Sequence, residues 1–196
     1  MNRLKNICVY CGSSPGRGDA YLSQATALAN ALVERNIGLV YGGASIGVMG
    51  RVADEVLKRN GRVIGVIPQA LATKEIAHEG LSELHITHSM HERKQLMAEL
   101  ADGFIALPGG IGTLEELFEI WTWAQLGLHQ KPCGLLNSSG YYDGLIGFLD
   151  HMRHQGFVKP AHRELLMLES DPGALLDRFA RYRAPVVEHW LTPDQT

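Results

Sequence analysis

Short apolar runs alternate with longer stretches of helical periodicity along most of this chain, and this alternation limits the folds that it can adopt. Helices that join parallel strands cover both faces of the sheet, so the strands are apolar at nearly every position. Runs of this kind lie at 6–11, 37–41, 62–67, 84–87, 103–107 and 132–136. Helical spacing is found at 19–36, 48–60, 89–101, 113–127, 141–155 and 172–183. The sequence therefore predicts an α/β fold, a Rossmann-like parallel sheet flanked by helices.

The length of 196 residues corresponds to about one domain. No repeat, low-complexity tract or linker divides the chain. We therefore expect a single Rossmann-like nucleotide-binding domain over 1–196, in which about 160–196 form a C-terminal helical extension.

Charge and cysteine content narrow the classes of partner and compartment. The formal net charge of −3 argues against a nucleic-acid polymer or an anionic membrane surface as partner. No apolar run is long enough to cross a membrane, and the first residues lack the apolar segment of a signal peptide. Three cysteines cannot form a disulfide framework, so we expect a cytoplasmic protein. Cys8 and Cys11 form a C-x-x-C inside an apolar run, and we interpret them as buried strand residues rather than a redox pair.

Glycine is enriched, with 22 of 196 residues, and two glycine-rich loops directly follow apolar runs. Ligands of parallel α/β sheets bind at this position, where a loop leads into a helix N-terminus with free N–H groups. Neither loop matches a dinucleotide or triphosphate fingerprint, which disfavours a hydride-transfer enzyme and an ATPase. A single such loop is more often only a tight turn, but two favour a phosphorylated ligand. The loops are Gly42-Gly43-Ala44-Ser45-Ile46-Gly47 and Pro108-Gly109-Gly110-Ile111-Gly112-Thr113.

Two acidic residues follow the second loop. Thr113 and Glu116 have the T-x-x-E spacing of a capping box, which predicts a structural role for Glu116 at the start of helix 113–127. Glu116 and its neighbour Glu115 also lie just beyond the predicted phosphate cradle. A carboxylate there could hold ribose hydroxyls, orient a water, or stabilise positive charge on a sugar carbon.

The helix at 89–101 has a capping box of its own, formed by Ser89 and Glu92. Arg93 follows and shares a stripe with apolar residues at i+3, i+4 and i+7, so it points towards the apolar side. A guanidinium there needs an internal carboxylate or an anionic ligand, and the sequence leaves both open. Lys94 points elsewhere, and we expect it to be solvated or at the edge of the ligand.

The nine histidines include three at spacings of three residues, at 85, 88 and 91. They straddle a strand end and a helix cap, so they do not share one helical face, and no H-E-x-x-H is present. We expect neither a metal site nor a cofactor.

The helix at 113–127 is apolar on two sides. Leu114, Leu117, Phe118 and Trp121 form one stripe, while Ile120 and Trp123 extend towards the opposite side. A helix apolar on two sides is usually covered on both, which predicts a homodimer through this helix. The alternative is that residues 156–196 fold back over Trp123.

Taken together, residues 90–94 (Met-His-Glu-Arg-Lys) and 108–116 (P-G-G-x-G-T-x-x-E) resemble the LONELY GUY family. These are cytokinin riboside 5′-monophosphate phosphoribohydrolases, historically mislabelled lysine decarboxylases. Further matches lie at 41–43, 45–47, 49–50 and 122–127, and the likeness covers residues 6 to 160. The resemblance implies hydrolysis of the N-glycosidic bond of a nucleoside 5′-monophosphate to the free base and ribose 5-phosphate.

The resemblance also implies roles for particular residues. The catalytic pair is Arg93 and Glu116, and the phosphate-binding backbone falls on Gly110, Ile111, Gly112 and Thr113. Other implied substrate contacts are Glu75, Lys94, Glu115 and Thr122, and the predicted binding set also includes Gly42, Gly43, Gly109 and Leu114. The sequence leaves open whether the base is adenine or an N6-prenylated adenine, a choice set by pocket residues near Cys11, Ser13 and Met97. A non-catalytic nucleotide or molybdenum-cofactor carrier and a phosphatase remain as alternative functions.

Overall fold

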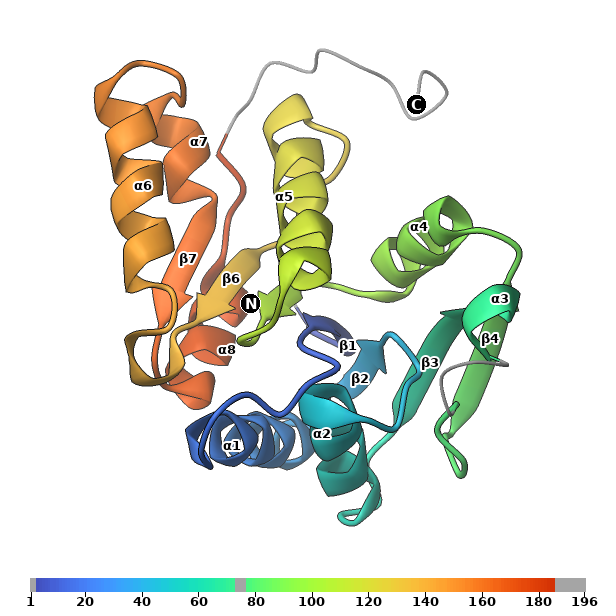
Figure 1. Cartoon of the computed structure of the whole chain (residues 1–196). Coiled ribbons are helices and arrows are strands. Elements are labelled where there is room, and N and C mark those ends of the chain that lie inside the picture. The colour runs from blue at the N-terminus through green and yellow to red at the C-terminus, as the bar shows by residue number, and fades with distance from the viewer. Residues whose placement is uncertain (1–2, 73–76, 186–196) are drawn as a thin grey trace.

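A computed structural model describes residues 3–72 and 77–185, and its centre is one sheet of seven parallel strands (Figure 1). The strand order is β4-β3-β2-β1-β5-β6-β7. This arrangement confirms the predicted α/β fold. The strands are β1 (Asn6–Tyr10), β2 (Gly38–Tyr41), β3 (Val63–Pro68), β4 (Glu83–Thr87), β5 (Phe104–Ala106), β6 (Cys133–Leu136) and β7 (Leu166–Glu169).

Helices cover both faces of the sheet. Figure 1 shows α1, α2 and α8 on one face and α4, α5 and α6 on the other. The helices are α1 (Ala20–Glu34), α2 (Gly47–Leu57), α3 (Gln69–Ala72), α4 (Met90–Leu100), α5 (Ile111–Leu126), α6 (Asp143–His154), α7 (Pro160–Glu164) and α8 (Pro172–Arg181), with a 3-10 turn η1 (Ser138–Gly140). Among the described residues, none of the helices is long and apolar enough to span a membrane.

The central strand β1 contributes to two separate cores because successive side chains point to opposite faces. Ile7 and Val9 pack with α1, α2 and α8, whereas Cys8 and Tyr10 pack with α4, α5 and α6. Cys8 and Cys11 are buried and free, which confirms the interpretation of the C-x-x-C as buried residues of the first strand region.

The segment expected to be a helical extension also contains a strand. Leu166–Glu169 form β7, which pairs with β6 at one edge of the sheet, between α7 and α8. The run of four apolar residues at 165–168, which overlaps β7, has no periodicity that separates a strand from a buried helix, so the pairing with β6 decides the outcome. Residues 186–196 of the expected extension lie outside the described part of the chain.

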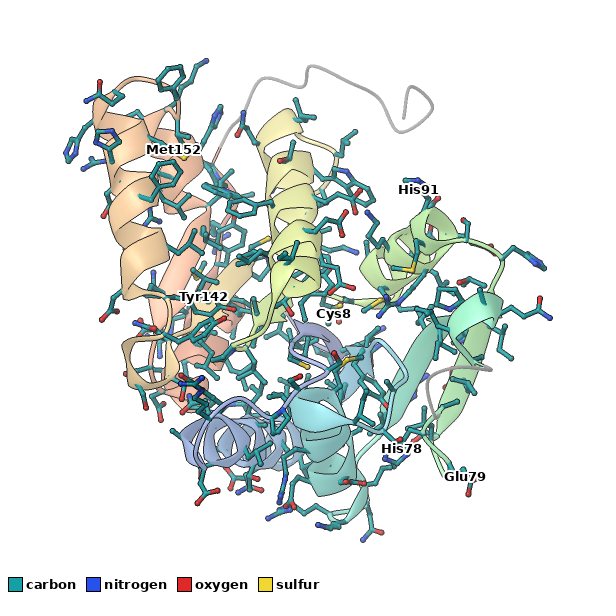
Figure 2. All side chains as sticks on the ribbon, viewed as in Figure 1. Cys8, His78, Glu79, His91, Tyr142 and Met152 are labelled. Carbon is teal, nitrogen blue, oxygen red and sulfur yellow. The ribbon has the colours of Figure 1, made fainter. Side chains whose placement is uncertain are left out.

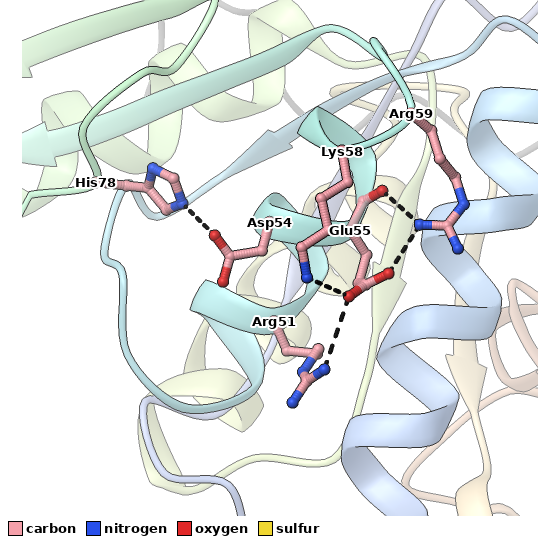
Figure 3. Close-up of polar contacts among 6 residues, drawn as sticks. All are labelled: Arg51, Asp54, Glu55, Lys58, Arg59 and His78. Carbon is pink, nitrogen blue, oxygen red and sulfur yellow. Dashed lines mark hydrogen bonds and ion pairs between the residues drawn. The ribbon is translucent and has the colours of Figure 1, made fainter.

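A polar cluster on α2 supports the loop that follows β2. Glu55 is buried, and its carboxylate accepts hydrogen bonds from Nζ of Lys58 at 2.9 Å and from Nη1 of Arg59 at 2.7 Å (Figure 3). These hydrogen bonds lower the pKa of Glu55. Next to it, Asp54 lies 3.0 Å from Nε2 of His78, whose backbone N–H donates to the carbonyl of Gly43. His78 therefore connects the first glycine loop to the outer side of α2.

Candidate active site

The second glycine loop forms the start of α5, and the structure corrects the expected helix cap. The helix begins at Ile111 with Gly110 as its N-cap, so Thr113 lies inside the first turn and makes no capping box with Glu116. Thr113 is buried instead, and a Cβ on Gly109 would lie 2.1 Å from its Oγ1. Gly109 is therefore required by the packing of Thr113 against the loop.

Gly110 and Gly112, unlike Gly109, are not in close contact with other residues of the protein. A Cβ on either residue would meet no atom within 4 Å, so the protein's own packing does not require glycine at these positions. The N–H groups of a first helical turn have no partner within the helix, and they carry the positive end of its dipole. The two glycines keep this surface bare, which is the geometry of a backbone cradle for an anion.

A cavity of about 340 Å³ opens in front of this cradle, between the ends of β1 and β2 and the helices α4 and α5. Of the predicted site residues, it brings together Gly42, Arg93, Gly110, Ile111, Gly112, Thr113, Glu115 and Glu116. Gly43, Lys94, Gly109, Leu114 and Thr122 do not line it, and Glu75 lies outside the described residues.

Arg93 lines the cavity, and its side chain points inward, as its place on the apolar stripe predicted. The helix α4 starts with Ser89 as N-cap, whose Oγ accepts the N–H of Glu92, and this directs Arg93 inward. The guanidinium is buried, its Nε donates to the carbonyl of Val66 at 3.1 Å, and Nη1 lies 3.6 Å from Oε1 of Glu116. The internal carboxylate that the sequence left open is therefore Glu116.

Gly42 leaves room for that guanidinium. A Cβ at this position would lie 2.1 Å from Nη2 of Arg93 and 2.6 Å from Cε of Met49. Within the described residues Nη2 has no hydrogen-bond acceptor, so Arg93 keeps a donor for a ligand in the cavity.

Glu116 is the acidic counterpart of Arg93 across the cavity. Its side chain is only 11% exposed, and burial raises its pKa to about 7 although the positive charge of Arg93 opposes this shift. The neighbouring carboxylate of Glu115 raises the pKa further. Glu116 therefore changes its charge near neutral pH, a property typical of functional carboxyl groups.

The expectation that Lys94 is solvated is wrong. Its side chain is buried, and Nζ lies 2.6 Å from Glu115 and 3.0 Å from Glu119. Burial lowers the pKa of Lys94, but the hydrogen bonds that its Nζ donates to the two carboxylates outweigh this effect and raise the pKa. Lys94 thus joins α4 to α5 and neutralises Glu115 at the rim of the cavity.

The other predicted contacts lie farther along α5 or behind the loop. Thr122 is exposed and donates to the carbonyl of Phe118 at 2.7 Å, so within one chain it does not reach the cavity. Leu114 is partly buried against the core on the α4 and α5 face. The roles of these residues in binding stay predictions.

Both apolar sides of α5 have neighbours in the chain, but one side keeps an open cavity. Trp121 donates through Nε1 to the carbonyl of His162, and His129 lies 2.8 Å from the carbonyl of Ile120. Trp123 instead lines a cavity of about 530 Å³ between α4 and the end of α5. The segment after residue 156 therefore covers Trp121, and no described residue of that segment lines the cavity beside Trp123.

Sequence reasoning missed much of the apolar wall of the candidate active site. Cys11, Ser13 and Met97, near which we expect from the sequence that the base binds, line it, and Met49, Leu71 and Met90 line it as well. Met49 and Met90 were recognisable as first-turn residues of helices that follow strands, the same topological position as the predicted cradle. In the described part of the chain no three His, Cys, Asp or Glu side chains are grouped so that they could hold a metal ion.

Known proteins are similar to this chain over most of its length. A family model described as "Possible lysine decarboxylase" matches residues 49–179. A Rhodococcoides fascians protein named cytokinin riboside 5′-monophosphate phosphoribohydrolase is 49% identical over 168 residues, 85% of each chain. An Arabidopsis thaliana protein of the same name is 47% identical over 191 residues, which cover 97% of this chain and 88% of the relative.

Solved structures at lower identity share the fold. The molybdenum cofactor binding protein of Rippkaea orientalis has a TM-score of 0.67 and 21% identity, with 90% of this chain and 96% of that chain covered. The molybdenum cofactor carrier protein of Chlamydomonas reinhardtii has a TM-score of 0.67 and 20% identity, with coverage of 89% and 96%. The identity of almost half to the phosphoribohydrolases, over most of both chains, shows that this chain belongs to the LONELY GUY family, whose motifs it carries at residues 90–94 and 108–116.

Proposed function

We propose that the protein hydrolyses the N-glycosidic bond of adenosine 5′-monophosphates, including N6-modified ones, and releases adenine or a free cytokinin base together with ribose 5-phosphate. The observation that carries the proposal is the buried pair of Arg93 and Glu116 in the same cavity as the bare first turn of α5. The names of its relatives in Rhodococcoides fascians and Arabidopsis thaliana support the same reaction.

The phosphate group binds at the start of α5 in this proposal. The N–H groups at Gly110, Ile111, Gly112 and Thr113 offer donors and the positive end of the helix dipole to the phosphate oxygens. Binding energy from the phosphate, which does not react, then orients the ribose carbon in front of Glu116.

Glu116 acts on the reacting carbon as a carboxylate. When the bond between C1′ and the base nitrogen breaks, its electrons leave with the base and positive charge develops on the ribose. Ionised Glu116 stabilises this charge and orients a water molecule. The water oxygen bonds to C1′, one of its protons goes to the leaving nitrogen, and the other stays on the new ribose hydroxyl.

Arg93 keeps a fraction of Glu116 ionised near neutral pH because its positive charge opposes the effect of burial on the pKa. Its Nη2 is also available to contact the ribose or the leaving base. Both roles depend on the same fixed guanidinium, which is held by the carbonyl of Val66.

The active form in this proposal is a homodimer through α5. Trp123 and the open cavity beside it support a second copy as the partner, because α5 has apolar residues on two sides. A partner there would also give Thr122 something to contact. We further propose a cytoplasmic location, which is supported by three free, buried cysteines.

The test is incubation of the protein with AMP and with N6-isopentenyl-AMP, followed by chromatography of free base and ribose 5-phosphate. Glu116→Gln and Arg93→Ala are assayed in parallel, after circular dichroism and gel filtration have shown that both fold and assemble like the wild type. We expect base release by the wild type and its loss in both variants. The better substrate identifies the physiological base.

Two other outcomes would contradict the proposal. Nucleotide binding without base release would mean that the protein is a non-catalytic carrier of nucleotides, the first of the alternative functions given above. Release of inorganic phosphate instead of base would mean that it is a phosphatase.

A further inference from the structure

Three consecutive carbonyls, from Leu107 just before the second glycine loop to Gly109 within it, each accept a hydrogen bond from a donor elsewhere in the chain. The hydroxyl of Tyr142 donates to Leu107 at 2.7 Å, the N–H of Gly12 donates to Pro108 at 3.2 Å, and the hydroxyl of Tyr141 donates to Gly109. A backbone carbonyl outside helices and strands can accept a hydrogen bond from water, from a backbone N–H or from a side chain. Here two adjacent tyrosine hydroxyls donate to carbonyls at the start of the same loop, which fixes the conformation of the loop backbone.

The three bonds differ in what they orient. A peptide unit is planar and trans, so its C=O and the N–H of the next residue point in opposite directions. The carbonyl of Gly109 shares its peptide plane with the N–H of Gly110, so Tyr141 directs that N–H away from itself. The carbonyl of Leu107 precedes Pro108, which has no N–H, so Tyr142 orients no donor.

The loop borders two neighbouring cavities, which share Gly12, Ser13 and Gly110 in their linings. Tyr141, Gly109 and Ser14 line one of about 210 Å³, whereas Arg93 and Glu116 line the cavity of the candidate active site. Gly110 lines both. The Gly110 N–H thus points away from the Tyr141 hydroxyl, and Gly110 also lines the cavity that contains Arg93 and Glu116.

The segment that carries the tyrosines is held in a fixed shape. Gly140 has a φ of +72°, and the side chain of Asn137 accepts the N–H of Tyr142 at 2.8 Å. The ring of Tyr141 packs edge-on against Tyr142 at 5.0 Å and against Tyr21 at 5.6 Å. Figure 2 labels Tyr142 at the N-terminal end of α6. The hydroxyl of Tyr141 is thus fixed although its side chain is partly exposed.

We propose that Tyr141 is a positioning residue, whose hydroxyl fixes the peptide between Gly109 and Gly110 so that the Gly110 N–H points at the substrate phosphate. This inference rests on the proposed function for the identity of the phosphate group. Tyr141 does not touch the reacting atoms and acts only through the loop.

The test compares Tyr141→Phe with two variants that make the same chemical change. Tyr21→Phe is the matched control, because Tyr21 belongs to the same ring cluster and its hydroxyl makes no hydrogen bond to the loop. Tyr142→Phe removes the neighbouring anchor that orients no N–H. Each variant is assayed for AMP hydrolysis, for hydrolysis of adenosine, which lacks the phosphate, and for binding of inorganic phosphate by calorimetry.

We expect Tyr141→Phe to raise KM for AMP and Kd for inorganic phosphate by roughly three- to tenfold, the effect of one neutral hydrogen bond. Its kcat for AMP and its kcat/KM for adenosine should change less than twofold. Tyr21→Phe should match the wild type, and Tyr142→Phe should lower Tm without changing phosphate affinity.

An unchanged Kd for phosphate in Tyr141→Phe would overturn the inference, and so would an equal loss with AMP and adenosine. The two proposals fail separately, because the calorimetric comparison does not depend on turnover. A wild type that binds phosphate but releases no base would contradict the proposed function alone, and Tyr141→Phe would still be judged by its phosphate affinity. A wild type that binds no phosphate would overturn the inference.

Discussion

The guanidinium of Arg93 and the carboxylate of Glu116 face each other at 3.6 Å, beyond hydrogen-bond distance, and both side chains are about nine-tenths buried. Burial raises the pKa of Glu116 to about 7, and Arg93 only partly offsets this. Glu116 therefore gains or loses its proton near neutral pH. The space between the pair and the phosphate cradle is available to a substrate.

The activity should rise with pH around neutrality. Glu116 must be ionised to stabilise positive charge on the ribose, so kcat/KM should increase through an apparent pKa near 7 and level off above it. Initial rates with AMP between pH 5 and 9 give this profile. A flat profile from pH 5 to 8 would contradict an essential carboxylate at this pKa.

Removing the charge of Arg93 should move the titration of Glu116 upwards. Arg93 lowers the pKa of Glu116, so Arg93→Met should raise it above 7. The carboxyl carbon of Glu116, observed by NMR in labelled protein, reports the shift even where activity is lost. Arg178→Met, on the opposite face of the sheet in α8, provides a control that should leave this titration unchanged.

Glu116 should make the folded protein less stable as the pH rises. Its pKa is raised in the folded state, so the folded form holds a proton that the unfolded chain has lost between pH 4.5 and 7. Stability from this group is therefore lost as the pH rises through that window. Urea unfolding of Glu116→Gln should show a gain over the wild type at pH 8 that exceeds any gain at pH 4, by up to about 3 kcal/mol. An identical difference at both pH values would be inconsistent with the raised pKa.

Gly112 offers a substitution that separates binding from folding. Gly112→Ala adds a Cβ in open space at the start of a helix, so Tm should stay equal or rise, while AMP hydrolysis should fall by at least about tenfold as the methyl group meets the phosphate. Gly147→Ala makes the same change in α6, also in open space, and should leave activity unaltered. Full activity of Gly112→Ala would mean that the phosphate does not approach this turn.

Lys94 should contribute to stability and to substrate affinity through its ion pairs with Glu115 and Glu119. Lys94→Met leaves Glu115 and Glu119 without their buried cation and should cost about 1–3 kcal/mol of stability. It should also raise KM for AMP, because Glu115 then carries uncompensated negative charge at the cavity rim. Addition of Glu115→Gln should restore part of both losses in a double-mutant cycle. Strictly additive effects would argue that Lys94 contacts the substrate instead.

The spacing of apolar residues along the sequence predicted the strands and the buried helix faces. The apolar runs located six of the seven strands, and the stripe through Arg93 predicted its inward direction, because strand burial and helix faces follow from residue spacing. The glycine loops after β2 and β5 were recognised for the same reason. Their position at the ends of parallel strands follows from the fold itself.

What the sequence could not supply depends on long-range contacts. The partners of Lys94 lie 21 and 25 residues away on another helix, so nothing near Lys94 indicated that it is buried. The expected cap at Thr113 failed because Gly110 already takes the extended conformation of an N-cap. The strand β7 exists only through its pairing with β6, and a four-residue apolar run carries no sign of that partner.

The order of the strands has a consequence for how the molecule is assembled. The strands β1 to β4 form one contiguous half of the sheet, and the chain then crosses through α4 to β5 on the other side of β1. Arg93 belongs to this crossing, whereas Glu116 comes from the helix that follows it. Until α5 has docked, the buried guanidinium lacks its counter-charge, so a chain fragment that ends before residue 111 contains a charge without compensation. We therefore expect the two halves to unfold together as one cooperative unit. Cutting the chain between the halves should lower the free energy of unfolding far more than removing one loop would.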